Sequence, residues 1–194
     1  GSKNNGITWT TSSSAADNTW NSVTYGNGLY VAVGATTTSN KNVMTSPDGV
    51  TWTLQTGSTT NSNWSSVTYG NGLFVAVAAS STSGFKAMTS PDGVTWTASS
   101  TPNNNRWTSV TYGKGLFVAV SATTTAAGSV MTSSNGITWT SRTGPACGAA
   151  SSVTYGNGLF IIPCSGNSAT GVYTSSDGIT WTARTTAGLP SMAV

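Results

Sequence analysis

The chain of 194 residues has no glutamate and no histidine, and its four aspartates are its only acidic side chains. Without histidine there is no Ser-His-Asp triad and no histidine-ligated metal. A glycosidase of the usual kind needs two carboxylic acids that flank the scissile bond, and the four scattered aspartates offer no obvious pair. We therefore expect a protein that is not an enzyme and that carries no metal and no cofactor.

Charge and long apolar runs are also scarce. Charged residues make up 6% of the chain, and the net charge is +3. There is no dense stripe of lysine and arginine, so nucleic-acid binding is not expected. No apolar run approaches the roughly 20 residues of a membrane-spanning helix. The nearly neutral, threonine- and asparagine-rich composition, with two cysteines, favours a secreted or cell-surface protein.

What the chain does have is a segment that occurs four times. The repeat is marked by tyrosines spaced 44, 43 and 43 residues apart, namely Tyr25, Tyr69, Tyr112 and Tyr155. A fixed period of this length means that supersecondary units stack on their neighbours. Positions held in every copy are expected to be scaffold, and positions that differ between copies are where function can lie.

The second repeat shows the strand pattern of every copy. Alternating or continuous apolar residues predict four strands, at 64–69, 73–77, 85–89 and 94–97. Hairpin-turn sequences separate the first pair and the last pair of these strands. Four hairpin-linked strands in one repeat are typical of a propeller blade. The sequence therefore predicts an all-β fold, a β-propeller of about four four-stranded blades, and no helix.

The repeat divides a single domain, residues 1–194, into blades at about 11–53, 54–97, 98–140 and 141–182. Residues 1–10 add a further copy of the outer strand, and residues 183–194 are a tail or the start of another blade. An open end would leave strand edges unpaired, which favours closure. The alternatives are a four-bladed ring closed by overlap of the chain ends, a fragment of a larger ring, and a homo-oligomer in which a second chain completes the ring.

The second turn of each repeat resembles the Asp-box of BNR-type β-propellers. In that family a Ser-x-Asp-x-Gly-x-Thr-Trp hairpin joins the third and fourth strands. The segment from Ser46 to Trp52 reads Ser-Pro-Asp-Gly-Val-Thr-Trp, one residue shorter between Asp and Gly. The resemblance implies a folding element away from the active site. BNR-type sialidases also use a glutamate, which this chain lacks, so the resemblance covers the scaffold and not catalysis.

The residues of this turn agree with a structural role. The Asp or Asn side chain can cap the turn through its own backbone, the glycine takes the strained position, and the tryptophan packs underneath. The structural turn residues are therefore Asp48, Asp92, Asn135, Asp177, Trp52, Trp96, Trp139 and Trp181.

The two faces of the propeller are expected to differ. Because strands alternate in direction, the two nearly identical turns of each repeat lie on one face. The loops between blades and the loops between second and third strands lie on the other, which we call the variable-loop face; they are residues 12–19, 55–63, 99–106 and 141–149, and residues 35–42, 79–86, 122–129 and 165–171. Binding residues tend to lie on variable loops of a rigid scaffold, so we place the binding surface there.

Three tryptophans at the entrance to the first strand have two interpretations. Each could be a stacking platform for a sugar ring, beside polar groups of the loops, or each could fill the wedge between neighbouring blades with its N–H bonded to backbone. The candidate ligand-binding residues under the first interpretation are Trp20, Trp64, Trp107, Asn18, Asn63, Asn105 and Arg106. Cationic side chains expected near this face would favour acidic glycans through steering, or would only aid solubility; they are Lys41, Lys86, Arg106, Arg142 and Arg184.

The fourth repeat differs at the tryptophan position, where it has Ala150. Cys147 lies three residues earlier, and Cys164 falls at the end of the inner strand of the same blade. A disulfide between them would add roughly 3 kcal/mol in the chain-entropy model. Two separately buried thiols are the alternative. Because the tryptophan is missing only where the cysteines occur, the repeat favours a structural part for the tryptophans.

These features favour a lectin-like, carbohydrate-binding propeller that binds glycans, including acidic ones, at several weak sites and gains affinity from multivalency. The alternatives are a structural or protein-adhesion surface module, including the phage-tail type, and an engineered or recently amplified repeat propeller without a ligand.

Overall fold

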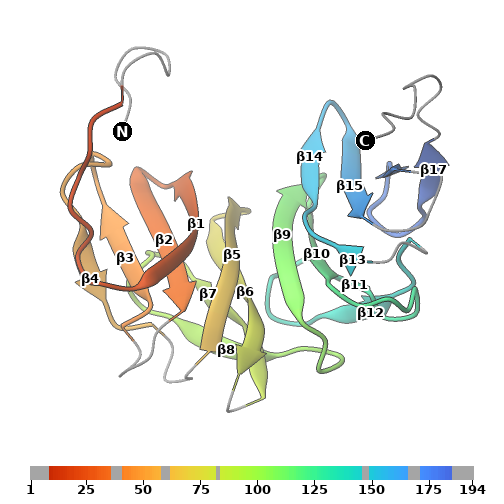
Figure 1. Ribbon diagram of the computed structural model, residues 1–194, viewed down its shortest axis with the longest axis horizontal. Helices are drawn as coiled ribbons and strands as arrows, with labels where there is room; N and C mark the ends of the chain where they lie inside the picture. Colours follow the sequence, from red (N-terminus) through yellow and green to blue (C-terminus); the bar gives the residue numbers. More distant parts are fainter. Residues whose placement is uncertain are drawn as a thin grey trace, which may run out of the picture.

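The computed structural model describes residues 9–35, 41–57, 62–81, 84–145, 149–165 and 171–184. Within these residues all regular structure is β-strand, and the strands form four antiparallel sheets that follow one another along the chain. Figure 1 shows the sheets as four blades, with the first strand of each blade on the inner side of an arc and the fourth on the outer side. The predicted all-β propeller of four four-stranded blades is confirmed.

The strands of blades 1 and 2 are β1 (Thr19–Gly26), β2 (Leu29–Ala35), β3 (Val43–Ser46) and β4 (Thr53–Gln55), then β5 (Ser62–Gly70), β6 (Leu73–Ser81), β7 (Phe85–Ser90) and β8 (Thr97–Ser100). Blade 3 consists of β9 (Trp107–Gly113), β10 (Leu116–Ser121), β11 (Val130–Ser133) and β12 (Thr140–Arg142). In blade 4 the first strand is split into β13 (Ala149–Ala150) and β14 (Thr154–Gly156); β15 (Leu159–Ser165), β16 (Val172–Ser175) and β17 (Thr182–Arg184) follow. Both pieces of the split strand pair with β15.

The hairpin between the first two strands has the same backbone geometry in every blade. In blade 1 its two central residues, Asn27 and Gly28, have φ of 49° and 76°. Positive φ at both positions is what a two-residue hairpin of type I′ requires. Lys114 takes the same conformation in blade 3, at φ 48°. Such a φ is uncommon for lysine, so the pairing of the flanking strands imposes it.

The turns between third and fourth strands, which we call the aspartate turns, are residues 46–51, 90–95, 133–138 and 175–180. In the first of them the Asp48 Oδ1 accepts hydrogen bonds from the amides of Val50 and Thr51, both at 2.8 Å. The Ser46 Oγ accepts one from the Gly49 amide at 2.8 Å. The other three turns repeat this network, and in blade 3 the amide oxygen of Asn135 takes the place of the carboxylate at 2.9 Å.

The first strand of blades 1 to 3 is bulged, and the bulge places one residue out of register with the second strand. The residues left out are Asn21, Ser65 and Thr108. A bulge re-aims the side chain that it carries. All three side chains donate to a backbone carbonyl of the next blade: Asn21 to Trp64 at 2.8 Å, Ser65 to Trp107 at 2.7 Å, and Thr108 to Ala150 at 2.9 Å.

The hydrophobic core is divided among the spaces between blades. Three clusters occupy the three interfaces, and in the first of them Val31 and Val33 of blade 1 pack with Trp64, Phe74 and other residues of blade 2. The second strand supplies residues to the blade before it and to the blade after it. This explains why it is apolar throughout rather than alternating, as expected of a strand covered on both sides.

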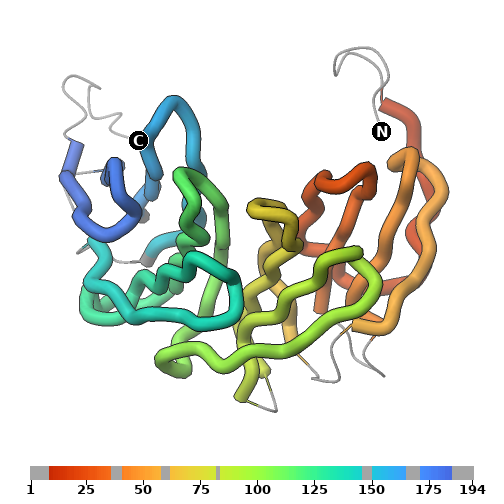
Figure 2. Tube along the Cα trace, turned by 180° about the vertical axis from the view of Figure 1, so that it is seen from behind, coloured from red at the N-terminus to blue at the C-terminus, as the bar shows by residue number. Residues whose placement is uncertain are grey.

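The four blades form an open arc, with blade 1 and blade 4 at its two ends (Figures 1 and 2). Val23 of blade 1 is 58% exposed, whereas its counterparts Val67, Val110 and Val153, each covered by a preceding blade, are 5% exposed. Most of the predicted extra outer strand at 1–10 and of the tail at 183–194 lies outside the described residues.

Candidate functional site

The variable-loop face carries a polar pocket where the inner strands of blades 1 to 3 converge. It has a volume of about 470 Å³ and is lined by Thr19, Asn21, Ala35, Asn63, Ser65, Ala79 and Arg106. These residues come from the beginning of β1 and β5, the end of β2 and β6, and the residue before β9. We call it the inner polar pocket.

Inter-blade hydrogen bonds hold part of this pocket in place. The Asn21 Nδ2 donates to the Trp64 carbonyl, and it also lies 3.5 Å from the Asn63 Oδ1. The Ser65 hydroxyl is directed to the carbonyls of Val77 and Trp107, at 3.0 and 2.7 Å. The bulges that carry Asn21 and Ser65 therefore fix two polar groups in the lining of the pocket.

The other three polar side chains of the pocket, those of Thr19, Asn63 and Arg106, are exposed. Asn63 and Arg106 both lie at the surface, and the guanidinium of Arg106 makes no hydrogen bond or ion pair within the described residues. No carboxylate is among the lining residues. The pocket thus offers amide and hydroxyl groups, which both donate and accept, together with one unpaired cation.

A second polar depression lies beside the first, between loops of blades 2 and 3. It has a volume of about 520 Å³ and is lined by Ser81, Gly84, Thr101, Asn103 and Asn104. Asn105, a predicted ligand residue, is not part of it. Its Nδ2 donates to the Gly128 carbonyl at 2.8 Å, and Asn103 donates to the same carbonyl at 3.0 Å. Asn105 braces the loop rather than facing a ligand.

The first-strand tryptophans are not equivalent. Trp64 and Trp107 are 0% exposed and belong to the clusters between blades. A ring without exposed surface cannot stack on a sugar, so packing between blades describes these two. The expected backbone bond is missing at Trp107, whose buried Nε1 has no partner within the described residues.

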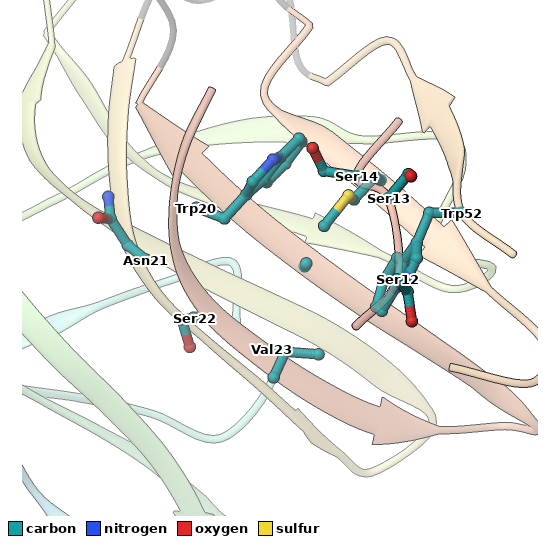
Figure 3. A pocket seen from close by; sticks show the side chains of 10 residues that line it. Ser12, Ser13, Ser14, Trp20, Asn21, Ser22, Val23 and Trp52 are labelled. Carbon is teal, nitrogen blue, oxygen red and sulfur yellow. The ribbon is translucent and has the colours of Figure 1, made fainter. Parts of the chain in front are cut away.

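Trp20 alone of the three is half-buried, because blade 1 has no blade in front of it. Its Nε1 donates to the Ala16 carbonyl at 3.3 Å. It lines a pocket of about 400 Å³ on the free side of blade 1, together with Val23, Met44 and Trp52 (Figure 3). Asn18, the other predicted ligand residue nearby, donates to the Lys41 carbonyl and so ties two loops of blade 1 together.

The cationic side chains are dispersed rather than gathered. Lys86 is buried, and its Nζ donates to the carbonyls of Asn104 and Asn105, both at 2.9 Å; this burial lowers its pKa. Arg142 and Arg184 each donate from Nε to a threonine of the neighbouring third strand. Of the five cations predicted near the variable-loop face, Arg106 is the one that lines the inner polar pocket.

Of the site residues proposed from the sequence, Asn63 and Arg106 lie together in the inner polar pocket, and Asn18, Asn105, Trp64 and Trp107 lie elsewhere. Asn21 and Ser65 were missed. A signal for them exists in the repeat, because residues 21, 65, 108 and 151 occupy one register position that is always occupied by Asn, Ser or Thr. That position needs a hydrogen-bonding side chain, although its link to a pocket depends on the bulge.

Several other features bear on chemistry. Among the described residues no group of three His, Cys, Asp or Glu side chains could hold a metal ion, and no helix is long and apolar enough to cross a membrane.

Cys164 packs against the third inter-blade cluster, and its register partner on β13 is Ala150. Cys147 lies outside the described residues, so the disulfide stays a prediction.

No family model and no curated protein matches this chain. Solved structures do. YCF48 bound to a D1 peptide matches 86% of this chain at a TM-score of 0.59 and 14% identity, and the computationally designed Ika4 protein matches 82% at 0.59 and 10%. The computationally designed Ika8 protein matches 80% at a TM-score of 0.56 and 11% identity.

The chain is a repeat β-propeller. At these identities the likeness establishes the fold alone. The propeller spans 55% of the YCF48 chain, 92% of the Ika4 chain and 45% of the Ika8 chain. That its aspartate turns are Asp-boxes of the BNR type remains a prediction.

Proposed function

We propose that this propeller is a non-catalytic, lectin-like module that binds glycans in the inner polar pocket. The observation that supports the proposal is the composition of that pocket, which combines Asn21, Asn63 and Ser65 with the unpaired guanidinium of Arg106. Sugar hydroxyls both donate and accept hydrogen bonds, and amide and hydroxyl side chains complement them. Arg106, with no carboxylate beside it, favours acidic glycans.

The proposal places binding on polar groups rather than on one tryptophan platform per blade. A shallow pocket of this kind binds each sugar weakly, so useful affinity comes from several copies on one surface. The absence of catalysis is part of the proposal, since Asp48, Asp92 and Asp177 accept hydrogen bonds within the aspartate turns. Secretion or display at the cell surface is also proposed, from composition.

A glycan array that contains neutral and acidic sugars tests this function. We expect a hit that free sugar abolishes. We expect Arg106→Ala to weaken binding of acidic glycans about tenfold or more, because a charge-assisted hydrogen bond is lost, and Asn63→Ala to weaken all hits about fivefold. Arg184→Ala removes the same charge from the outer strand of blade 4 and is the matched control, with binding unchanged.

Two results would contradict the proposal. A blank array at several densities would rule out a multivalent lectin and favour a propeller without a sugar ligand. Glycan binding that is equally strong in the wild type and in both pocket variants would place the site away from the inner polar pocket.

A peptide is the second candidate ligand, favoured by the solved propeller YCF48, which is described as bound to a D1 peptide. A peptide carboxylate would use the same Arg106 guanidinium. Screening a library of peptides with free carboxyl ends separates the two candidates. Peptide capture that Arg106→Ala abolishes, together with a blank glycan array, would replace the lectin by a peptide-binding adhesion module.

We also propose the disulfide between Cys147 and Cys164. Cys147 precedes Ala150 by three residues, and Ala150 is paired with Cys164 across β13 and β15. Peptide mapping of the non-reduced protein is expected to give one cross-linked fragment that contains both cysteines. Quantitative alkylation of both thiols without reductant would contradict the pairing.

A further inference from the structure

The two ends of the arc expose faces that are covered everywhere else in the molecule. The leading face belongs to blade 1 and includes Val23, Tyr25 and Gly49. The trailing face belongs to blade 4 and includes Ser151, Ser152, Gly156 and Ile161. Each of the three internal interfaces joins a trailing face to a leading face, so the contacts of those interfaces show what the two end faces are built to receive.

The first repeated contact joins a serine to a valine amide. The Ser22 Oγ accepts a hydrogen bond from the Val67 amide, Ser66 from Val110, and Ser109 from Val153, all at 3.1 Å. The fourth serine of the series is Ser152, which is exposed and has no hydrogen-bond partner within the described residues. On the leading face, the Val23 amide occupies the position of these valine amides, and among the described residues no serine accepts from it.

The second repeated contact is the bond from the bulge residue to a carbonyl 42 or 43 residues later. Asn21, Ser65 and Thr108 make it to blades 2, 3 and 4. The fourth member is Ser151, which is exposed on the trailing face. The carbonyl at the matching position of the leading face is that of Trp20.

The third repeated contact places a tyrosine ring on a glycine. A Cβ atom on Gly26 would overlap the ring of Tyr69, and the same holds for Gly70 with Tyr112 and for Gly113 with Tyr155. These glycines are needed because the ring lies directly on the backbone. Gly156 continues the series, yet a Cβ there would meet no atom of the described residues within 4 Å. The tyrosine without a glycine is Tyr25, which is 58% exposed.

The fourth repeated contact is apolar. A Cβ on Gly93 would lie 2.9 Å from the Val31 Cγ2, and a Cβ on Gly136 or Gly178 would lie 2.8 Å from the corresponding valine of the preceding blade. At Gly49 of the leading face the nearest side chain is Tyr30 of its own blade, at 3.6 Å. The side chain that continues the valine series on the trailing face is Ile161.

The leading face also contains a pocket for the apolar side chains of the trailing face. Its pocket of about 400 Å³ is bounded by Trp20, Val23, Ala32, Met44 and Trp52, with Ser12 to Ser14 along one edge (Figure 3). In blade 2 the equivalent residues pack against Val31, Val33 and Val43 of blade 1. The pocket is therefore the vacant half of an inter-blade core.

We propose that the trailing face of one copy of this chain docks on the leading face of a second copy, and that two copies close one ring through two such interfaces. All four repeated contacts are interrupted at the same two faces, and what each face lacks the other supplies. Within one chain these faces lie at opposite ends of the arc (Figures 1 and 2). A contact between unlike faces closes a ring when the rotation between copies completes the circle.

Native mass spectrometry and light scattering test the proposal. The wild type is expected at twice the chain mass of 19.6 kDa, with a single-chain fraction that grows on dilution. Gly156→Val is expected to leave single chains with unchanged circular dichroism, because the new side chain meets none of the described residues of its own copy and overlaps Tyr25 of the other.

Val23→Asp is a second interface variant. It places a charge in the apolar interface between the two copies, at a position that is exposed in the single chain. Its matched control is Val94→Asp, the same change at a valine that is 44% exposed in the second blade, away from both end faces. The control is expected to pair like the wild type.

Mixing the two interface variants tests which faces meet. A Gly156→Val copy keeps an intact leading face and a Val23→Asp copy keeps an intact trailing face, so the mixture is expected to form mixed pairs while neither variant pairs alone. A wild type that is a single chain at 100 µM overturns the proposal. So does an assembly of three or more copies, and so does pairing that survives both substitutions.

Discussion

Each aspartate turn is organised by one serine hydroxyl and one side-chain oxygen, which belongs to a carboxylate in blades 1, 2 and 4 and to the Asn135 amide in blade 3. In blade 2 the Asp92 Oδ1 accepts hydrogen bonds from two amides at 2.9 and 2.7 Å, which lowers its pKa from 3.8 to about 2. Hydrogen bonds to backbone amides likewise bring the pKa of Asp48 and Asp177 to about 2. A carboxylate that is hydrogen-bonded in its charged form resists protonation. Asn135 makes the same bonds without a charge.

The triple variant Asp48→Asn, Asp92→Asn and Asp177→Asn isolates this effect. The folded pKa values lie below the unfolded one, so the carboxylates stabilise the fold fully above about pH 4, and that contribution is lost as the pH falls through about 2. The variant is expected to be less stable than the wild type at pH 7 and to lose less stability between pH 5 and pH 2. Thermal unfolding across this range measures both.

The reciprocal change provides the control. Asn135→Asp adds a fourth carboxylate to the same turn network and is expected to steepen the loss of stability in acid. If the triple variant keeps the full acid sensitivity of the wild type, the pH dependence comes from other groups.

The bulged first strand of blades 1 to 3 joins two blades rather than completing one. Its glycine accepts the tyrosine of the next blade, so a small side chain at that end of the strand determines how closely two sheets approach. A Cβ at Gly113 overlaps the Tyr155 ring. A Cβ at Gly156, the same register position one blade later, lies within 4 Å of no atom in the part of the chain that the structure describes.

Gly113→Ala is expected to destabilise the protein by about 1–3 kcal/mol, because overpacking moves the ring or the backbone. Gly156→Ala is the matched control and is expected to change stability by a few tenths of a kcal/mol, since neither glycine has positive φ. Urea unfolding at a dilution where the wild type is a single chain makes the comparison. Equal effects from both substitutions would show that the glycine serves the strand and not the neighbouring blade.

Most strands and turns were predictable because each recurs in the sequence at a fixed spacing. The fourth strand of the second repeat, predicted at 94–97, begins only at Thr97, because residues 94 and 95 belong to the aspartate turn. The environment of each copy was not predictable. Trp20 and Trp64 have nearly the same sequence around them, yet one is half-buried and the other is fully buried, because only the second has a blade in front of it. The roles of Asn63 and Asn105 differ because loop contacts, such as the bond of Asn105 to Gly128, are decided in three dimensions.

At the scale of the whole molecule, the number of blades could be counted from the repeat, and how the ring closes could not. Closure depends on the rotation between neighbouring blades, which many small contacts determine together. The open arc therefore emerges only when the blades are placed in space (Figures 1 and 2). The four interrupted contact series at its ends then identify which surfaces are incomplete.

The division of the core among the spaces between blades has a consequence for how such a chain can change. A single repeat has no interior of its own, so stability accumulates as neighbours are added, and the outermost repeats are the first to fray. A duplicated repeat, however, brings both halves of its contacts with it. Gaining or losing one repeat changes the circumference while every junction stays the same, so duplication can alter ring size without inventing a new surface.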